Sequence, residues 1–135
     1  MVDILDLTGV NLDNTFEPTT LPKGEEAKLR IVSFLNDVDK NGVKYVMPFF
    51  ESVQDPYCKE FGDYIPLPHD GMSPKDLNRA KLKLAGFLSA FGVDASKELN
   101  PDKDIIGREG WAILGMGKDQ DDLPTNKISK YVIGN

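Results

Sequence analysis

The clearest spacing for chemistry is a set of three oxygen-bearing side chains between two runs of β-forming residues. Asp37, Asp39 and Asn41, followed by Gly42, match the first half of an EF-hand calcium loop. The twelfth position of such a loop needs a bidentate glutamate, and Pro48 stands there. The flanking residues alternate as strands do, whereas this loop needs helices on both sides. We therefore expect a hairpin turn here and no calcium site.

A second stretch imitates a phosphate-binding loop but lacks the residue that would meet magnesium. Residues 112–118 read AILGMGK, and Asp119 follows where the loop requires serine or threonine. The polar residues that follow include Pro124, so no helix is expected after the loop. The glycines fit a curved strand better than a phosphate cradle.

The remaining nucleophilic and metal-binding side chains are too few to form a site. His69 and Cys58 are each the single residue of their kind, which excludes the usual zinc sites. No G-x-S-x-G element is present, and the scattered carboxylates suggest no acid–base pair. We predict no catalytic residue, no metal and no cofactor, and therefore that the chain is not an enzyme.

Basic and aromatic residues on the expected strands suggest a different kind of chemistry. Proteins that hold single-stranded nucleic acid need cations for the phosphates and aromatic faces on which bases stack. Each residue also has an alternative role, because aromatic rings often belong to the core and lysines keep surfaces soluble. The candidate nucleic-acid-binding residues are Lys28, Arg30, Phe34, Lys44, Phe50, Tyr64, Trp111, Lys118, Lys127 and Tyr131.

The net charge of −6 does not exclude such a site, because the acids are concentrated at the start of the chain. Residues 1–26 hold six acids and one base, and the remaining residues hold 16 acids and 15 bases. We expect residues 1–24 to form an extended acidic arm and residues 25–135 to form one domain. No apolar run is long enough to cross a membrane, and one cysteine permits no internal disulfide.

The elements that would position these residues are five strands and one helix. Ser73 to Gly92 is the clearest element, with a capping serine, Pro74 at the first turn and a terminal glycine. Its apolar residues recur at helical spacing, and Lys75, Arg79 and Lys83 share the opposite face. Alternating apolar residues and turn signals predict strands at 27–35, 43–53, 60–68, 110–117 and 127–133.

Three strands, a helix and two strands are the element order of an OB fold. We therefore predict a mainly β protein, a five-stranded OB-like Greek-key barrel with the amphipathic helix between strands 3 and 4. A plain α+β sheet covered by one helix has the same order, so this alternative stays open. On the first strand, alternation places Phe34 on the face of Lys28 and Arg30, and on the second it places Phe50 with Lys44.

Three stretches resemble a family of small phage-encoded single-stranded DNA-binding proteins of the OB-fold type. They are LNRAKLKLAGFLSAFGVDASKEL, IIGREGWAILGMGKD and the closing NKISKYV, within residues 25–133. The resemblance implies a barrel that coats single-stranded DNA during phage replication or recombination, in the cytoplasm of the host cell. Its implied partners are single-stranded DNA and replication or recombination proteins, with no membrane.

The expected function is therefore binding and protection of single-stranded DNA without strong sequence preference. The alternative is a structural or adaptor protein of a virion or replication complex that uses the same barrel for protein contacts. The chain ends without the acidic, aromatic-tipped tail by which many single-stranded DNA-binding proteins recruit partners. The oligomeric state, including a homo-oligomer, stays open.

Overall fold

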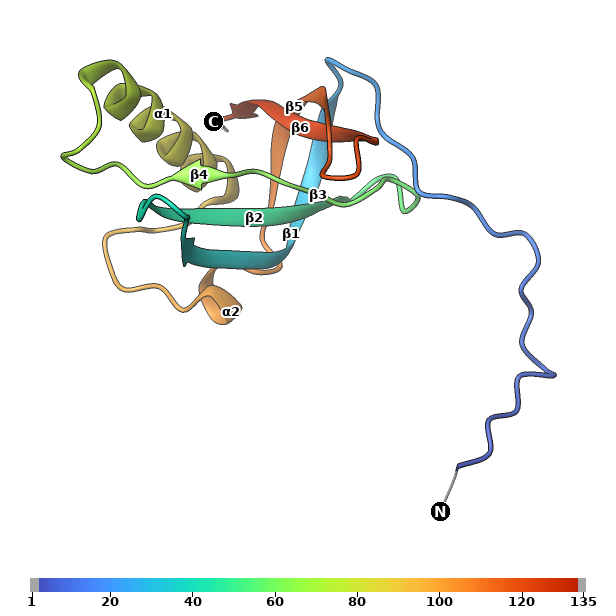
Figure 1. Ribbon diagram of the computed structural model, residues 1–135. Coiled ribbons are helices and arrows are strands. Elements are labelled where there is room, and N and C mark those ends of the chain that lie inside the picture. Colours follow the sequence, from blue (N-terminus) through green and yellow to red (C-terminus); the bar gives the residue numbers. More distant parts are fainter. Residues whose placement is uncertain (1–2, 134–135) are drawn as a thin grey trace.

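A long, strongly bent hairpin forms the centre of the fold in the computed structural model, which describes residues 3–133. Its strands are β1 (Glu26–Val38) and β2 (Lys44–Ser52), followed by the short strands β3 (Phe61–Gly62) and β4 (Ile65–Pro66). Helices α1 (Pro74–Phe91) and α2 (Pro101–Asp104) come next, and β5 (Glu109–Lys118) and β6 (Pro124–Val132) form the second hairpin (Figure 1).

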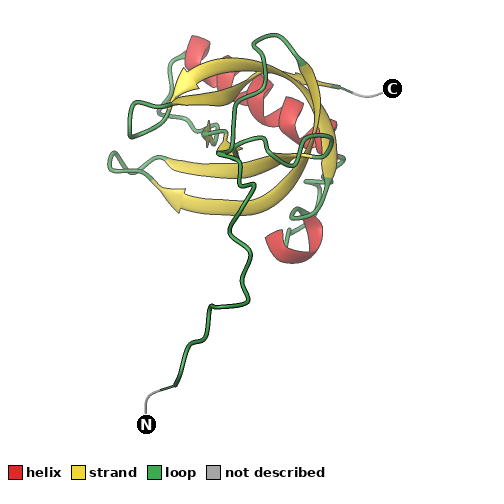
Figure 2. Cartoon of the chain, turned by 90° about the vertical axis from the view of Figure 1, so that its right-hand side faces the viewer, coloured by secondary structure: helices red, strands yellow, loops and turns green. Residues whose placement is uncertain are grey.

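The strands form one antiparallel sheet of six strands in the order β3-β2-β1-β5-β6, with β4 also paired to β2. The sheet curls strongly (Figure 2), but within residues 3–133 its end strands β3 and β6 share no hydrogen-bonded ladder. The prediction of a mainly β fold with one amphipathic helix is confirmed, and α1 lies between β4 and β5 in the chain. A closed five-stranded barrel is not what the sheet forms.

The expected third strand is divided in two because of Pro48. Pro48 has no amide hydrogen to donate, and the residues across from it, between Gly62 and Ile65, leave the ladder. Only the Pro48 carbonyl accepts a bond there, from the Asp63 amide at 3.0 Å. The effect of Pro48 is therefore an interruption in the neighbouring strand, while β2 itself continues through it.

Helix α1 has the ends that its sequence predicts. The Ser73 hydroxyl accepts a hydrogen bond from the Asp76 amide at 3.2 Å, and Pro74 begins the helix. Gly92 ends it in the left-handed region, with φ 67°, and donates to the carbonyl groups of the last turn. The helix crosses one side of the curled sheet (Figure 2) and buries Ala80, Phe87 and Phe91 against it.

The core lies between α1 and the concave face of the sheet. Phe50, Phe87, Phe91 and Tyr131 form its aromatic centre, with ring centroids 5.4 to 6.5 Å apart. Burying rings of this size is the main apolar contribution to stability. The other members are mainly aliphatic: Ala27, Leu29, Ile31, Ile65, Val93, Ile105, Ala112 and Leu114, together with Phe61.

Two β-bulges reverse the alternation of side chains along β1 and β6. On β1, Ile31 pairs with Phe50 and Ser33 pairs with Phe49, so Val32 has no partner. On β6, Lys130 pairs with Ile113 and Ile128 pairs with Leu114, so Ser129 has none. Residues beyond each bulge therefore face the side opposite to the one that strict alternation predicts.

The arm before β1 extends away from the sheet and helices (Figures 1 and 2). Residues 3–18 are exposed, and Thr19 is the first residue to pair, in a parallel bridge with Cys58. Leu21 then exchanges hydrogen bonds with the side-chain amide of Asn126, which ties the arm to β6. No helix among the described residues is both long and apolar enough to cross a membrane.

Candidate nucleic-acid interface

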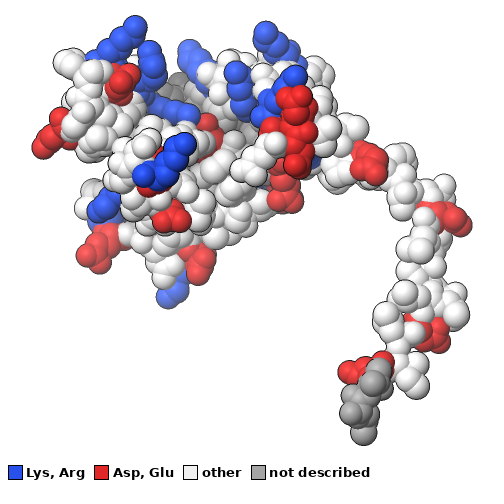
Figure 3. Space-filling view, in the orientation of Figure 1, with Lys and Arg blue, Asp and Glu red and all other residues white. Residues whose placement is uncertain are grey.

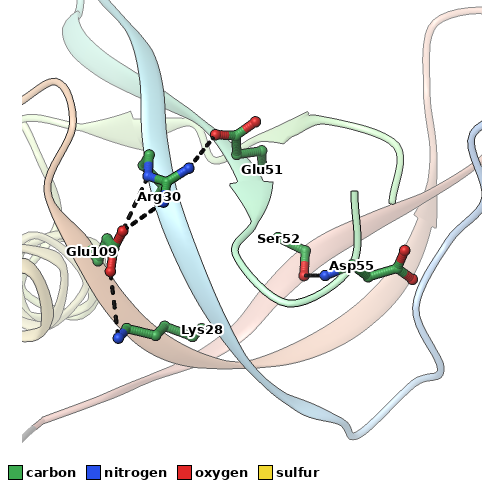
Figure 4. Close-up of polar contacts among 6 residues, drawn as sticks. All are labelled: Lys28, Arg30, Glu51, Ser52, Asp55 and Glu109. Atoms are coloured by element: carbon green, nitrogen blue, oxygen red, sulfur yellow. Dashed lines mark hydrogen bonds and ion pairs between the residues drawn. The ribbon is translucent and has the colours of Figure 1, made fainter. Parts of the chain in front are cut away.

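Lys28 and Arg30 lie on the convex face of the sheet, but both are bound to carboxylates (Figure 4). The register places Arg30 opposite Glu51 on β2 and opposite Glu109 on β5. The Arg30 guanidinium donates to Glu51 at 2.9 Å and to Glu109 at 2.8 and 3.1 Å. Lys28 Nζ lies 3.4 Å from the other Glu109 oxygen. These contacts join three neighbouring strands.

This network has two cations and two carboxylates, so its local charge is balanced. The hydrogen bond from Arg30, followed by that from Lys28, lowers the pKa of Glu109 below its ordinary value. The bonds from Glu109 and then Glu51 raise the pKa of Arg30. A phosphate at Arg30 would have to displace carboxylates that already hold it in good geometry.

Two of the expected base-stacking rings lie in the core, and a third, Phe34, is partly buried against it. Phe50 is 0% exposed and Tyr131 is 6% exposed. Phe34 packs against Phe87, with ring centroids 6.3 Å apart, because the bulge at Val32 turns it inward. Phe50 belongs to the inward face of β2, and the bulge on β6 turns Tyr131 inward, so neither presents a face to a base. Phe34 faces the helix side of the sheet, away from Lys28 and Arg30.

Lys44, Tyr64, Lys118 and Lys127 are accessible but are not gathered into one groove. Lys44 is exposed at the start of β2, while Lys118 lies at the end of β5 and pairs with Asp122 at 3.4 Å. Lys127 lies over Gly115 and Gly117 on the β5–β6 hairpin. Tyr64 lies beside β2, where its ring meets Tyr45 with centroids 4.7 Å apart. The expected site residues therefore divide between separate parts of the surface.

The surface around Tyr64 carries charges of both signs. Arg79 and Lys83 line the hollow beside it, and Lys83 Nζ donates to the carbonyl of Tyr64. The Tyr64 hydroxyl donates to Asp39 at 2.9 Å. Backbone bonding from Val43, with smaller contributions from Tyr64 and Asn41, lowers the pKa of Asp39, so this carboxyl stays ionised at neutral pH. A fixed negative charge beside the ring repels a phosphate.

Trp111 is an expected stacking residue that is exposed and has a lysine on each neighbouring strand. It is 38% exposed on the convex face of β5, opposite Lys28 on β1 and Val132 on β6. Lys130 pairs with Ile113, two residues along β5, which makes it a diagonal neighbour of Trp111. An indole flanked by two ammonium groups fits a base and its adjoining phosphates.

Two adjoining hollows continue from this point across β6 to α1. The first, of about 400 Å³, lies between α1 and β6 and has Arg79, Lys83 and Lys130 among its lining residues. The second, of about 390 Å³, reaches Ile113 and Val132 on the convex face, and its charged lining residues are Lys130 and Glu26. They share Lys130, Tyr131 and Ile133, so one continuous surface runs from α1 over β6 toward Trp111. We call it the α1–β6 surface.

Positive charge is concentrated on the elements that form the α1–β6 surface. Helix α1 carries four cations and one acid, and β6 carries two cations and no acid. Figure 3 shows basic side chains gathered along the upper edge of the molecule, over α1 and β6. Within residues 3–133, Lys75, Lys81, Lys127 and Lys130 take part in no ion pair. Such cations are available to an anionic ligand.

The sequence-based list missed Arg79, Lys83 and Lys130. Arg79 and Lys83 were assigned to the solvent-facing side of the helix, and Lys130 was not singled out. The signal that would have found them is the charge of each element, since α1 and β6 are strongly basic in an acidic chain.

Comparison with known proteins gives no match: no family model fits the chain, and no curated protein resembles it significantly. Within residues 3–133, no three histidine, cysteine, aspartate or glutamate side chains gather closely enough to hold a metal ion. Asp39, in the calcium-like motif, instead accepts the amides of Asn41 and Val43 as a turn residue does.

Proposed function

We propose that this chain binds single-stranded DNA without strong sequence preference, through the α1–β6 surface and Trp111. The observation that carries the proposal is the hollow between α1 and β6, which is lined by cations from both elements. The adjoining hollow reaches Val132, the strand partner of the exposed Trp111. Single-strand binding needs this combination of positive charge and an aromatic face. The replication or recombination role belongs to the same proposal.

In this proposal the phosphates are bound by Arg79 and Lys130, with Lys83 between them on the helix. Arg79 has only a long contact with Asp76, at 3.9 Å and on an exposed surface, so it can turn toward a phosphate. Lys83 Nζ lies 3.0 Å from Oδ1 of Asp63, so this ion pair competes with a phosphate for the Lys83 ammonium. Trp111 stacks with a base, and Lys28 beside it contacts the adjoining phosphate when Glu109 releases it.

We further propose that the sheet is an OB-like barrel whose last seam is made by side chains. Counting β3 and β4 as one strand, the order 3-2-1-4-5 is that of the OB Greek key. Support for the seam comes from Tyr131 on β6, whose hydroxyl donates to Asp63, between β3 and β4, at 2.5 Å. Asp63 also pairs with Lys83 of α1, so sheet edge and helix are joined at this point.

The test is a titration of a fluorescently labelled, mixed-sequence oligonucleotide at two salt concentrations. Binding should quench Trp111, and each phosphate contact on a single strand contributes about −0.7 to the slope of log K against log salt. Three contacts therefore predict a slope of about −2. Duplex DNA should bind more weakly, because its stacked bases do not offer a face to Trp111.

Charge reversal separates a specific surface from general attraction. The variant with Arg79→Glu and Lys130→Glu should bind at least about tenfold more weakly. The control with Lys97→Glu and Lys103→Glu has the same change in net charge on exposed residues away from the α1–β6 surface, and should bind like the unmodified chain. Equal loss in both variants would contradict the proposed surface. Absence of any binding by the unmodified chain would instead favour the adaptor role.

A further inference from the structure

The arm exposes many large apolar side chains, whereas a tail that is only solvated is normally polar. Six large apolar residues in the arm are between 51% and 96% exposed, namely Ile4, Leu5, Leu7, Val10, Leu12 and Phe16. The same stretch, residues 3–18, carries four acids and no base. An exposed segment with this composition is typical of an interaction surface, because contiguous apolar area is costly in water.

The groove between α1 and β6 has the complementary composition. Leu82 and Ile133 on its walls are 66% and 62% exposed, and Ile128 also lines it. Its charged lining residues are Arg79, Lys83 and Lys130, and none of its lining residues is acidic.

We propose that the arm of one molecule docks in the α1–β6 groove of a second copy. Apolar side chains of the arm would cover Leu82 and Ile133, and its carboxylates would face Arg79 and Lys130. Complementary charge fixes the partner and the direction of approach. The contact joins two different surfaces, so each copy has a free arm or a free groove, and chains of molecules can form.

The structure favours docking of the arm on a second copy over docking in the α1–β6 groove of the same molecule. Phe16 packs against Tyr57, with ring centroids 4.9 Å apart, and Thr19 pairs with Cys58, which directs the arm away from the body. Residues 3–15 can span about 40 Å when extended, enough to reach a neighbouring molecule. The proposal does not rest on DNA binding, although a bound strand would compete for the same groove.

The primary experiment measures self-association of the full chain by sedimentation velocity over a concentration series, without DNA. The unmodified chain should associate, and the exposed-residue variant Leu5→Ser, Leu7→Ser, Leu12→Ser should lose that association. Lys130→Glu should weaken it by about tenfold, whereas the matched control Lys97→Glu should leave it unchanged. These arm residues contribute nothing to the core, so the arm variant tests docking and not folding.

A second measurement locates the contact and shows that it is intermolecular. One preparation carries Thr15→Cys together with Cys58→Ser, so that a spin label attaches only in the arm. It is mixed with ¹⁵N-enriched chain that carries no label. Amide signals of Lys83, Lys130 and Ile133 should broaden in the enriched chain. A monomer at all concentrations, association that survives the arm variant, or unchanged amide signals of Lys83, Lys130 and Ile133 in the mixture would each overturn the proposal. None of these results bears on oligonucleotide binding.

Discussion

Replacing Tyr131 by phenylalanine tests the side-chain seam between β6 and the β3–β4 segment. Tyr131→Phe keeps the ring in the core and removes only the hydroxyl that donates to Asp63 at 2.5 Å. Asp63 is 7% exposed, so water cannot readily replace the lost donor at Oδ2. Its other oxygen keeps Lys83 at 3.0 Å. A hydrogen bond to a charged, buried group contributes about 1.5–3 kcal/mol, so we expect a loss of about 2 kcal/mol.

The dependence of this loss on pH gives a sharper test. Burial first, and the negative charge of Asp63 second, raise the pKa of Tyr131 above its ordinary value of 10. A raised folded-state pKa means that the contribution to stability is fully present below pH 10. Above that pH the unfolded phenol ionises while the folded one does not, and the contribution falls by about 1.4 kcal/mol per pH unit. The difference between the two chains should therefore shrink to about 0.6 kcal/mol at pH 11.

The assay is urea denaturation followed by Trp111 fluorescence and by circular dichroism at pH 8 and pH 11. Tyr57→Phe is the matched control, because Tyr57 is 53% exposed on the surface. Its free energy of unfolding should stay within about 0.5 kcal/mol of the unmodified chain at both pH values. A loss of under about 0.5 kcal/mol for Tyr131→Phe at pH 8, or a loss that does not change with pH, would refute the reasoning.

Two further substitutions test the packing and the ion-pair network. Gly110→Ala would place a Cβ 2.4 Å from the Ala90 carbonyl oxygen, so thermal melts should show a loss of about 2 kcal/mol. Gly117→Ala, where the nearest atom is a flexible lysine carbon at 3.6 Å, should change little and serves as the control. Glu109→Gln should release Lys28 and tighten oligonucleotide binding a few-fold, with under about 1 kcal/mol change in stability. Unchanged affinity would remove Lys28 from the proposed interface.

The element types could be predicted because their signals are local. A capping serine, a proline at the first turn and a left-handed glycine lie within one stretch of sequence, and α1 begins and ends where they stand. The hairpin between β1 and β2 could be predicted for the same reason, because its turn residues lie within one short stretch of sequence. Helix α2 was missed, although Asn100 caps it and Pro101 begins it, since four residues show no periodicity.

The faces of the strands could not be predicted as well, because a bulge leaves no mark in an alternating pattern. One unpaired residue, Val32, transfers Phe34 from the convex face to the helix side of the sheet. Ser129 does the same for Tyr131, while Lys127 before it stays outside. Two single-residue β-bulges thus explain why these two rings face the helix side of the sheet, where strict alternation predicted them on the outer face.

Whether a cation is available to a ligand depends on partners that are distant in the sequence. Arg30 looks like a phosphate-binding residue on a strand, yet the register brings it Glu51 and Glu109 from the neighbouring strands. Lys130 looks ordinary, yet it lies opposite Ile113 and takes part in no ion pair within residues 3–133. Since an exposed, unpaired ammonium exchanges only water for a phosphate, it binds the more readily of the two. The acidic total of the chain therefore says little about its ligand, because residues 1–26, with six acids and one base, hold most of the excess negative charge while α1 and β6 stay basic.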